Sequence, residues 1–182
     1  MNVKNHIAIF VPSLRGGGAE RVMIDLACGF VERGYSADLV LAKAEGPYLR
    51  NAMASIRVID LNSPRVFASI IPVARYLRRE RPKALLSAMT HANICALWAA
   101  RLAGVSTRIV VSERNTLSQS ARNTVIKRQK IMPRLVRIFY PWADGIVAVS
   151  RGVADDLYQM TGLPQNCVTV IYNPVVTPEL LA

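Results

Sequence analysis

The sequence predicts an α/β domain built on one doubly wound parallel sheet. Its 182 residues are 52% hydrophobic and 19% charged, which leaves room for one domain with a substantial core. Short β-branched runs alternate with segments of helical periodicity along the whole chain. The segment Arg108–Ser112 contains a continuous apolar run, which is typical of parallel strands covered on both faces.

Six or seven strands are expected, each a short apolar run. The candidate strands are Ile7–Val11, Ala37–Ala42, Arg57–Leu61, Ala84–Ala88, Arg108–Ser112, Gly145–Val149 and Val168–Ile171. The candidate helices between them are Ala19–Arg33, Val66–Arg81, His91–Ala103, Ser120–Tyr140 and Gly152–Met160. Right-handed crossovers then favour the strand order 3-2-1-4-5-6, and place the glycines at 16 to 18 at the carboxyl edge of the sheet.

Several residues mark where these helices begin, bend or end. Gly104 is expected to close the helix that starts at His91, and Ser150 is a good N-cap. Pro72 is expected to kink its helix, and Pro133 to interrupt the basic segment 120–140.

The formal net charge of +11 would attract nucleic acid, an anionic membrane surface or a phosphorylated substrate. Cys28, Cys95 and Cys167 are far apart and lie among apolar neighbours, so we expect buried free thiols and a reducing compartment. The run Ile7–Val11 is too short for a signal-peptide core, and the uncharged stretch Ala84–Ala100 is too polar to span a bilayer. The expected location is cytoplasmic, either soluble or peripheral on the inner face of the membrane.

Gly16, Gly17 and Gly18 form a turn between the first strand and the first helix. Such a turn suits an anion, because glycines allow close approach and the helix N-terminus presents free N–H groups. A Walker A loop is excluded, since no Gly-Lys-Ser/Thr ending follows. A dinucleotide fingerprint is disfavoured, because Arg21 replaces its third glycine and the second strand ends without an acidic residue. A tight turn without a ligand is the alternative.

Four blocks of sequence, in order, resemble glycosyltransferase family 4. They are Phe10–Arg21, Thr90–Asn93, Val111–Asn115, and Ala143–Ser150 followed by Val170–Pro174. The resemblance implies a GT-B architecture, in which two Rossmann-like domains face each other across a cleft. In that family the N-terminal domain binds the acceptor, and the C-terminal domain holds the nucleotide-sugar through paired glutamates. We therefore expect residues 1–174 to be the acceptor-side domain and residues 175–182 to begin the interdomain linker, with the donor-binding domain absent from this sequence.

The resemblance also implies a catalytic role for His91, near the transferred sugar. The candidate substrate-binding residues all follow strands: Gly16, Gly17, Gly18, Glu113, Arg114, Asn115, Ser150 and Arg151. Arg114 suits a phosphate or carboxylate through its planar fork. We expect these blocks to line one groove, because the carboxyl ends of parallel strands share an edge. Structural alternatives are a ligand-free histidine at a helix start, a Glu113–Arg114 pair and an ordinary cap at Ser150.

The basic segment 120–140 interleaves cationic and apolar residues, which favours a helix on an anionic membrane surface. The residues assigned to that surface are Lys127, Arg128, Lys130 and Arg134. A cationic, solvated helix face is the alternative.

Together these features predict an acceptor-binding domain of a retaining glycosyltransferase. The donor would be a UDP- or GDP-linked sugar, and a lipid-linked acceptor is one candidate. No cofactor and no metal are expected, since no Asp-x-Asp cluster ends a strand. One alternative is a nicotinamide-dependent oxidoreductase domain. The other is a non-catalytic, basic nucleic-acid-binding domain, for which the sequence lacks a helix-turn-helix, zinc-finger or aromatic RNP pattern. A nucleic-acid partner is therefore not expected.

Overall fold

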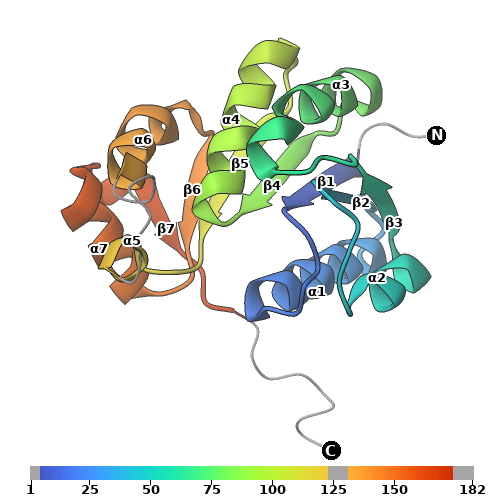
Figure 1. The fold of residues 1–182 in the computed structure, drawn as a ribbon, viewed down its shortest axis with the longest axis horizontal. Coiled ribbons are helices and arrows are strands. Elements are labelled where there is room, and N and C mark those ends of the chain that lie inside the picture. The colour runs from blue at the N-terminus through green and yellow to red at the C-terminus, as the bar shows by residue number, and fades with distance from the viewer. Residues whose placement is uncertain (1–4, 123–130, 174–182) are drawn as a thin grey trace, which may run out of the picture.

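The computed structural model describes residues 5–122 and 131–173, which fold around one seven-stranded sheet (Figure 1). The strands are β1 (His6–Val11), β2 (Ser36–Leu41), β3 (Arg57–Asp60), β4 (Ala84–Ala88), β5 (Arg108–Glu113), β6 (Gly145–Ala148) and β7 (Val168–Val170). Every pair is parallel, and the order is β3-β2-β1-β4-β5-β6-β7. The predicted fold class and strand order are confirmed, with β7 added beyond β6.

The helices are α1 (Gly18–Glu32), α2 (Leu49–Ser55), α3 (Ile70–Glu80), α4 (Thr90–Ala103), α5 (Leu117–Arg122), α6 (Met132–Phe139) and α7 (Arg151–Thr161). Short 3-10 turns occur at Val66–Ser69, Tyr140–Trp142 and Gln165–Cys167. In Figure 1, α1 and α2 lie on one side of the sheet, and α3 and α4 lie on the other.

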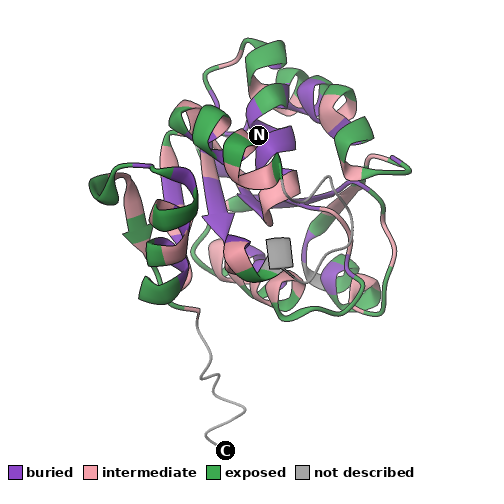
Figure 2. Cartoon of the chain, turned by 60° about the vertical axis from the view of Figure 1, so that its left-hand side comes forward, coloured by how far each residue is buried: buried purple, intermediate pink, exposed green. Residues whose placement is uncertain are grey.

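Two hydrophobic cores lie on the two faces, because alternate residues of a strand point in opposite directions. On one face, Phe10, Leu85 and Val111 pack with residues of α3, α4, α6 and α7. We call this the covered face. On the other face, Ile9 and Leu39 pack with residues of α1 and α2. Figure 2 shows the buried strands between helices whose outer sides are exposed.

The structure differs from the predicted elements at three places. Helix α2 was not predicted, because its seven residues carry neither a capping side chain nor a clear apolar stripe. Pro72 does not kink a helix: a 3-10 turn precedes α3, and Pro72 lies in the first turn of α3, where a missing N–H costs little. Within the predicted helix 120–140, α6 begins only at Met132, and Pro133 lies in its first turn, which agrees with the predicted interruption at this proline.

The ends of two helices follow the predicted signals. Gly104 adopts the left-handed conformation, with φ of 62°, and closes α4. The Ser150 hydroxyl accepts a hydrogen bond of 3.2 Å from the backbone N–H of Val153 and caps α7. All three cysteines are free thiols; Cys95 is buried, whereas Cys28 and Cys167 are partly buried.

Candidate functional site

The glycine turn lies at the carboxyl edge of β1, as predicted, and leads into α1. Gly16 has φ of +111°, a conformation that a side chain would strain. At Gly17, an added Cβ would collide with the carboxylate of Glu20, which stands over the start of the helix. An acidic side chain in the first turn of a helix also interacts favourably with the helix dipole.

The loop after β2 is clamped to the loop after β1. Leu14 donates its backbone N–H to the carbonyl of Glu45 at 2.9 Å. Gly46, with φ of +117°, lies so close to the Leu14 carbonyl that no Cβ would fit. The Glu45 carboxylate is paired with Arg15, at 2.6 Å, and with Lys43, at 3.0 Å. The loop after β3 joins this assembly, since Ser63 donates its N–H to the carbonyl of Ala42 at 2.8 Å.

These loops and the start of α4 enclose a pocket of about 270 Å³. Its lining, which defines what we call the polar pocket, consists of Pro12, Ser13, Arg15, Ala42, Lys43, Glu45, Ser63, Pro64, Arg65, Val66 and His91. Hydroxyl, carboxylate and cationic groups thus converge there with one imidazole. A saccharide could exchange its hydroxyl hydrogen bonds with water for bonds to these groups.

His91 is the second residue of α4 and is partly buried in the polar pocket. Burial lowers the pKa of its imidazole below the ordinary value. The ring is therefore mainly neutral at pH 7, so one nitrogen can donate and the other can accept a hydrogen bond.

Glu113 lies on the covered face at the end of β5 and is 1% exposed. Thr90 donates its hydroxyl to one carboxylate oxygen at 3.0 Å. The other oxygen accepts hydrogen bonds from the hydroxyl of Tyr140 and from the amide of Asn93, the latter at 3.3 Å. Burial raises the pKa of Glu113 to about 7. Its carboxylate does not open into the polar pocket, contrary to the expectation that it lines the substrate groove.

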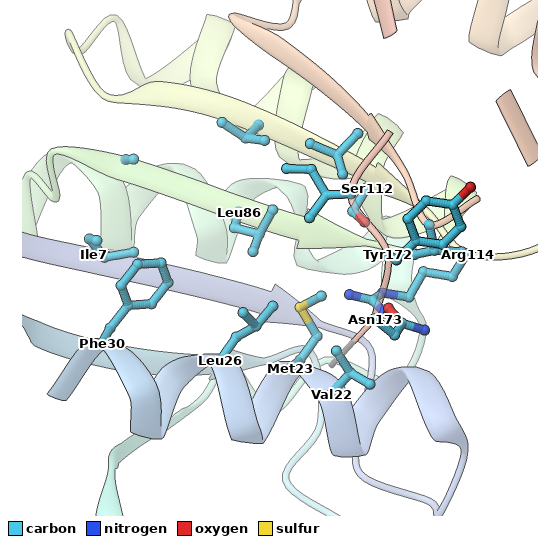
Figure 3. Close-up of a pocket in the computed structure, with 15 residues that line it drawn as sticks. Ile7, Val22, Met23, Leu26, Phe30, Leu86, Ser112, Arg114, Tyr172 and Asn173 are labelled. Atoms are coloured by element: carbon cyan, nitrogen blue, oxygen red, sulfur yellow. The ribbon is translucent and has the colours of Figure 1, made fainter. Parts of the chain in front are cut away.

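Arg114 points away from Glu113, to the opposite face of the sheet (Figure 3). It donates from Nη1 to the Oδ1 atom of Asn173 at 2.7 Å, while its Nε is buried without a partner. Burial lowers the pKa of this guanidinium to about 10. The Asn173 amide is neutral, so it supplies no countercharge.

Beside Arg114 runs a cavity of about 300 Å³, which we call the apolar groove. Its lining is Ile7, Val22, Met23, Leu26, Phe30, Ala84, Leu86, Val110, Ser112, Arg114, Val147, Val149, Ile171, Tyr172 and Asn173. Figure 3 shows the side chains of α1 forming one wall of the groove and the strands forming the other. Among the described residues, α1 lies along one side of the groove and residues 171–173 lie at its end. No described helix covers the strand residues of β4, β5 and β6 that line the groove.

The remaining predicted residues are scattered along the same edge. Ser150 uses its hydroxyl for the cap of α7, and Asn115 and Arg151 are exposed. Arg134 is exposed on α6, whereas Lys127, Arg128 and Lys130 lie outside the described residues. The structure therefore places His91 in one cavity with Ser13 and Arg15, which precede the glycine turn, and places Arg114 in a second cavity.

Sequence reasoning missed Arg15, Lys43, Glu45, Ser63 and Arg65, which complete the polar pocket. All of them lie in loops after β1, β2 or β3. That position, at the carboxyl edge of predicted strands, was the available signal.

A seven-stranded parallel sheet with a glycine turn and a polar pocket at its carboxyl edge defines a Rossmann-like ligand-binding domain. The chain belongs to Glycosyltransferase Family 4, whose family model matches residues 16–178. This membership decides for the glycosyltransferase class over the oxidoreductase and nucleic-acid-binding alternatives. A comparison with curated protein sequences gave no significant match.

Solved structures with the same fold include several glycosyltransferases. The lipopolysaccharide outer core galactosyltransferase WaaB, in its apo form, has a TM-score of 0.72 at 17% identity, over 93% of this chain and 46% of WaaB. Anabaena HepE, solved in complex with UDP-glucose, has a TM-score of 0.72 at 19% identity, over 96% of this chain and 47% of HepE. A glycosyltransferase from Rickettsia africae has a TM-score of 0.63 at 18% identity, over 98% and 48% of the two chains. Identities this low establish the fold alone, and the chain spans just under half the length of these proteins.

Two further observations concern residues 5–122 and 131–173 only. None of the helices there combines the length and the apolar character needed to cross a bilayer. No cluster of three or more histidine, cysteine or acidic side chains occurs there in a position to hold a metal ion.

Proposed function

We propose that this chain is the acceptor-binding half of a retaining glycosyltransferase, whose second half holds a UDP- or GDP-linked sugar. The observation that carries the proposal is the polar pocket with His91 at the carboxyl edge, in a chain that belongs to Glycosyltransferase Family 4. HepE was solved with UDP-glucose, which supports a nucleotide-sugar as the donor.

In this proposal the polar pocket receives the acceptor, and His91 contacts the sugar being transferred. A neutral imidazole can bind a hydroxyl group in either sense, as a donor or as an acceptor. The N–H groups of residues 16–18 offer additional donors at the same edge. Outside the polar pocket, Arg114, Asn115, Ser150 and Arg151 follow the neighbouring strands β5 and β6, where we propose that they contact an anionic group of the acceptor. Arg114 fits such a group best, because the one partner of its partly buried guanidinium within the described part of the chain is the neutral amide of Asn173.

Residues 1–174 form the acceptor-side domain in this proposal, and residues 175–182, which lie outside the described residues, begin the linker. The second half packs over the apolar groove. Two observations support this arrangement: residues 171–173, which precede the proposed linker, line the groove, and the structural relatives are about twice as long. Covering the groove would also remove exposed apolar surface formed by Ile171 and Tyr172.

A lipid-linked acceptor would bring the enzyme to the inner face of the membrane. The net charge of +11 and the exposed cation Arg134 on α6 support attraction to anionic lipid. Ile138, which is 56% exposed on the same helix, could insert among lipid head groups.

Binding measurements on this 182-residue chain test the proposal. Calorimetry against UDP- and GDP-sugars should give no micromolar affinity, because the proposal assigns donor binding to the other half of the enzyme. Saturation-transfer NMR with a panel of saccharides should detect contacts that His91→Ala abolishes. Arg108→Ala is the matched control, since it removes a cation from the opposite, amino edge of the sheet. Micromolar binding of a nucleotide-sugar, or saccharide contacts that survive in His91→Ala, would overturn the acceptor-side assignment.

A further inference from the structure

Helix α4 carries His91 and begins with a strained turn. Met89, between β4 and α4, has φ of 78° and ψ of 133°, which a side chain rarely adopts. Such a conformation persists only when the surrounding structure holds it on several sides. The backbone N–H of Met89 donates to the carbonyl of Ser112 at 3.3 Å, which ties the turn to the end of β5.

Asn93 holds the turn from the helix side and is fully buried. It accepts a hydrogen bond from the hydroxyl of Ser87 at 2.7 Å, and its amide donates to the carbonyl of Ser112 at 3.0 Å. The same amide lies 2.9 Å from the hydroxyl oxygen of Tyr140. These bonds fix the first turn of α4 against the ends of β4 and β5.

Glu113 completes this arrangement from beneath. Its Oε2 atom accepts the hydroxyl hydrogen bond of Thr90, the residue next to His91, and its Oε1 atom serves Asn93 and Tyr140. The two oxygens therefore bind different elements. Oε2 binds Thr90, next to the imidazole, and Oε1 binds Asn93 and Tyr140, the residue that follows α6.

We infer that Glu113 is a positioning residue, which fixes the imidazole of His91 in the polar pocket through the hydroxyl of Thr90. The inference rests on the proposed function, since it assigns His91 to the acceptor. Glu113 itself contacts no substrate, because its carboxylate is buried and its hydrogen bonds are internal. The contact that carries this role is the hydrogen bond from the Thr90 hydroxyl to Glu113.

NMR of the two histidines, His6 and His91, provides a test that needs no ligand. His6 lies at the start of β1, 3.0 Å from Asp38, and serves as the internal reference. Thr90→Val, which removes the hydroxyl at nearly constant volume, and Glu113→Gln should shift the imidazole signals and the titration midpoint of His91. The signals of His6 should not move, and Thr90→Ser should restore the wild-type signals of His91.

Tyr140→Phe is the matched control, because it removes a hydrogen bond to the other oxygen of the same carboxylate. It should lower the melting temperature without moving the signals of His91. If Thr90→Val leaves His91 unchanged, or Tyr140→Phe shifts it equally, Glu113 has only a general structural role.

Saccharide binding provides the second readout. Affinity should fall about tenfold in Thr90→Val and in Glu113→Gln, as expected when a neutral hydrogen bond that orders a binding group is lost. It should stay near the wild-type value in Thr90→Ser and Tyr140→Phe, and equal losses in all four variants would contradict the inference. If the wild-type chain binds no saccharide, the proposed function is contradicted. The role of Glu113 is then still tested by the histidine signals.

Discussion

The two faces of the sheet differ sharply over β4, β5 and β6. On the covered face, Leu85 and Val111 are fully buried beneath the helices. On the other face, their neighbours Leu86 and Val110 border the apolar groove and remain partly exposed. Yet both sets are apolar, as expected for parallel strands buried on two sides. This difference is what we expect if the second half of the enzyme packs over the apolar groove, as proposed above.

Glu113 and Arg114 show the same contrast with charged groups. The carboxylate on the covered face has hydrogen-bond donors at both oxygens, whereas the guanidinium at the groove has one neutral partner among residues 5–122 and 131–173. Buried polar groups in a closed core usually have hydrogen-bond partners. A surface that binds another domain can leave some of its polar groups without partners until that domain binds. The contrast can be tested by four changes, taken in order of their expected effect on the free energy of unfolding.

The largest effect is expected from truncating adjacent leucines of β4. Leu85→Ala should lower the free energy of unfolding by about 4 kcal/mol, because it opens a cavity in a closed core. Leu86→Ala should cost about 1 kcal/mol, since its site is already open to solvent. Urea denaturation measures both values. Equal costs would mean that the groove is as well packed as the covered face.

The second effect is a pH dependence from Glu113. Burial raises the pKa of Glu113 to about 7 in the folded state, above the ordinary value of 4.5 for a glutamate. The folded protein therefore binds a proton that the unfolded chain has released, and the stability gained is lost as the pH rises from about 4.5 to 7. That loss amounts to about 3 kcal/mol. Denaturation curves for Glu113→Gln should lack this slope, and a variant with an unchanged slope would assign the proton elsewhere.

A smaller effect is expected at Arg114. Arg114→Met should leave the free energy of unfolding unchanged or raise it by up to about 1 kcal/mol, because it removes a desolvated charge without a countercharge. Inorganic phosphate should raise the melting temperature of the wild type more than that of the variant. Arg151→Met is a suitable control, since Arg151 is exposed at the same edge. A large destabilisation by Arg114→Met would show that this face is already complete.

The smallest effect on stability is expected from the proposed membrane surface. Replacing Lys127, Arg128, Lys130 and Arg134 with glutamine should leave unfolding unchanged but abolish binding to anionic vesicles. Each cation near such a surface contributes about 1 kcal/mol, and salt screens the attraction over about 10 Å at 0.1 M. Cosedimentation with neutral and anionic vesicles checks this. Equal binding to both vesicle types, or undiminished binding by the variant, would leave a solvated helix face.

The sequence was sufficient for the sheet and its edge, because apolar periodicity, Gly104 and Ser150 act locally. It was not sufficient for the site. The expectation that Glu113 and Arg114 share a groove overlooked strand alternation, which sends adjacent side chains to opposite faces. The polar pocket was also beyond reach in detail, since Ser63 and Arg65 reach it from a loop without periodicity. The role of Asn93 depends on Tyr140, which lies 47 residues further along the chain.

The tight contact between Gly46 and Leu14 joins two of the loops that line the polar pocket. There is no space for a side chain between these two residues, and a backbone hydrogen bond joins Leu14 to Glu45. We therefore expect the loops after β1 and β2 to move together as one unit. The backbone hydrogen bond from Ser63 to Ala42 adds the loop after β3 to that unit. His91 stands on the opposite side, on a separate helix. We therefore expect the wall formed by these three loops and the wall formed by α4 to keep their own internal geometry when a ligand enters the polar pocket, since each is held by its own hydrogen bonds.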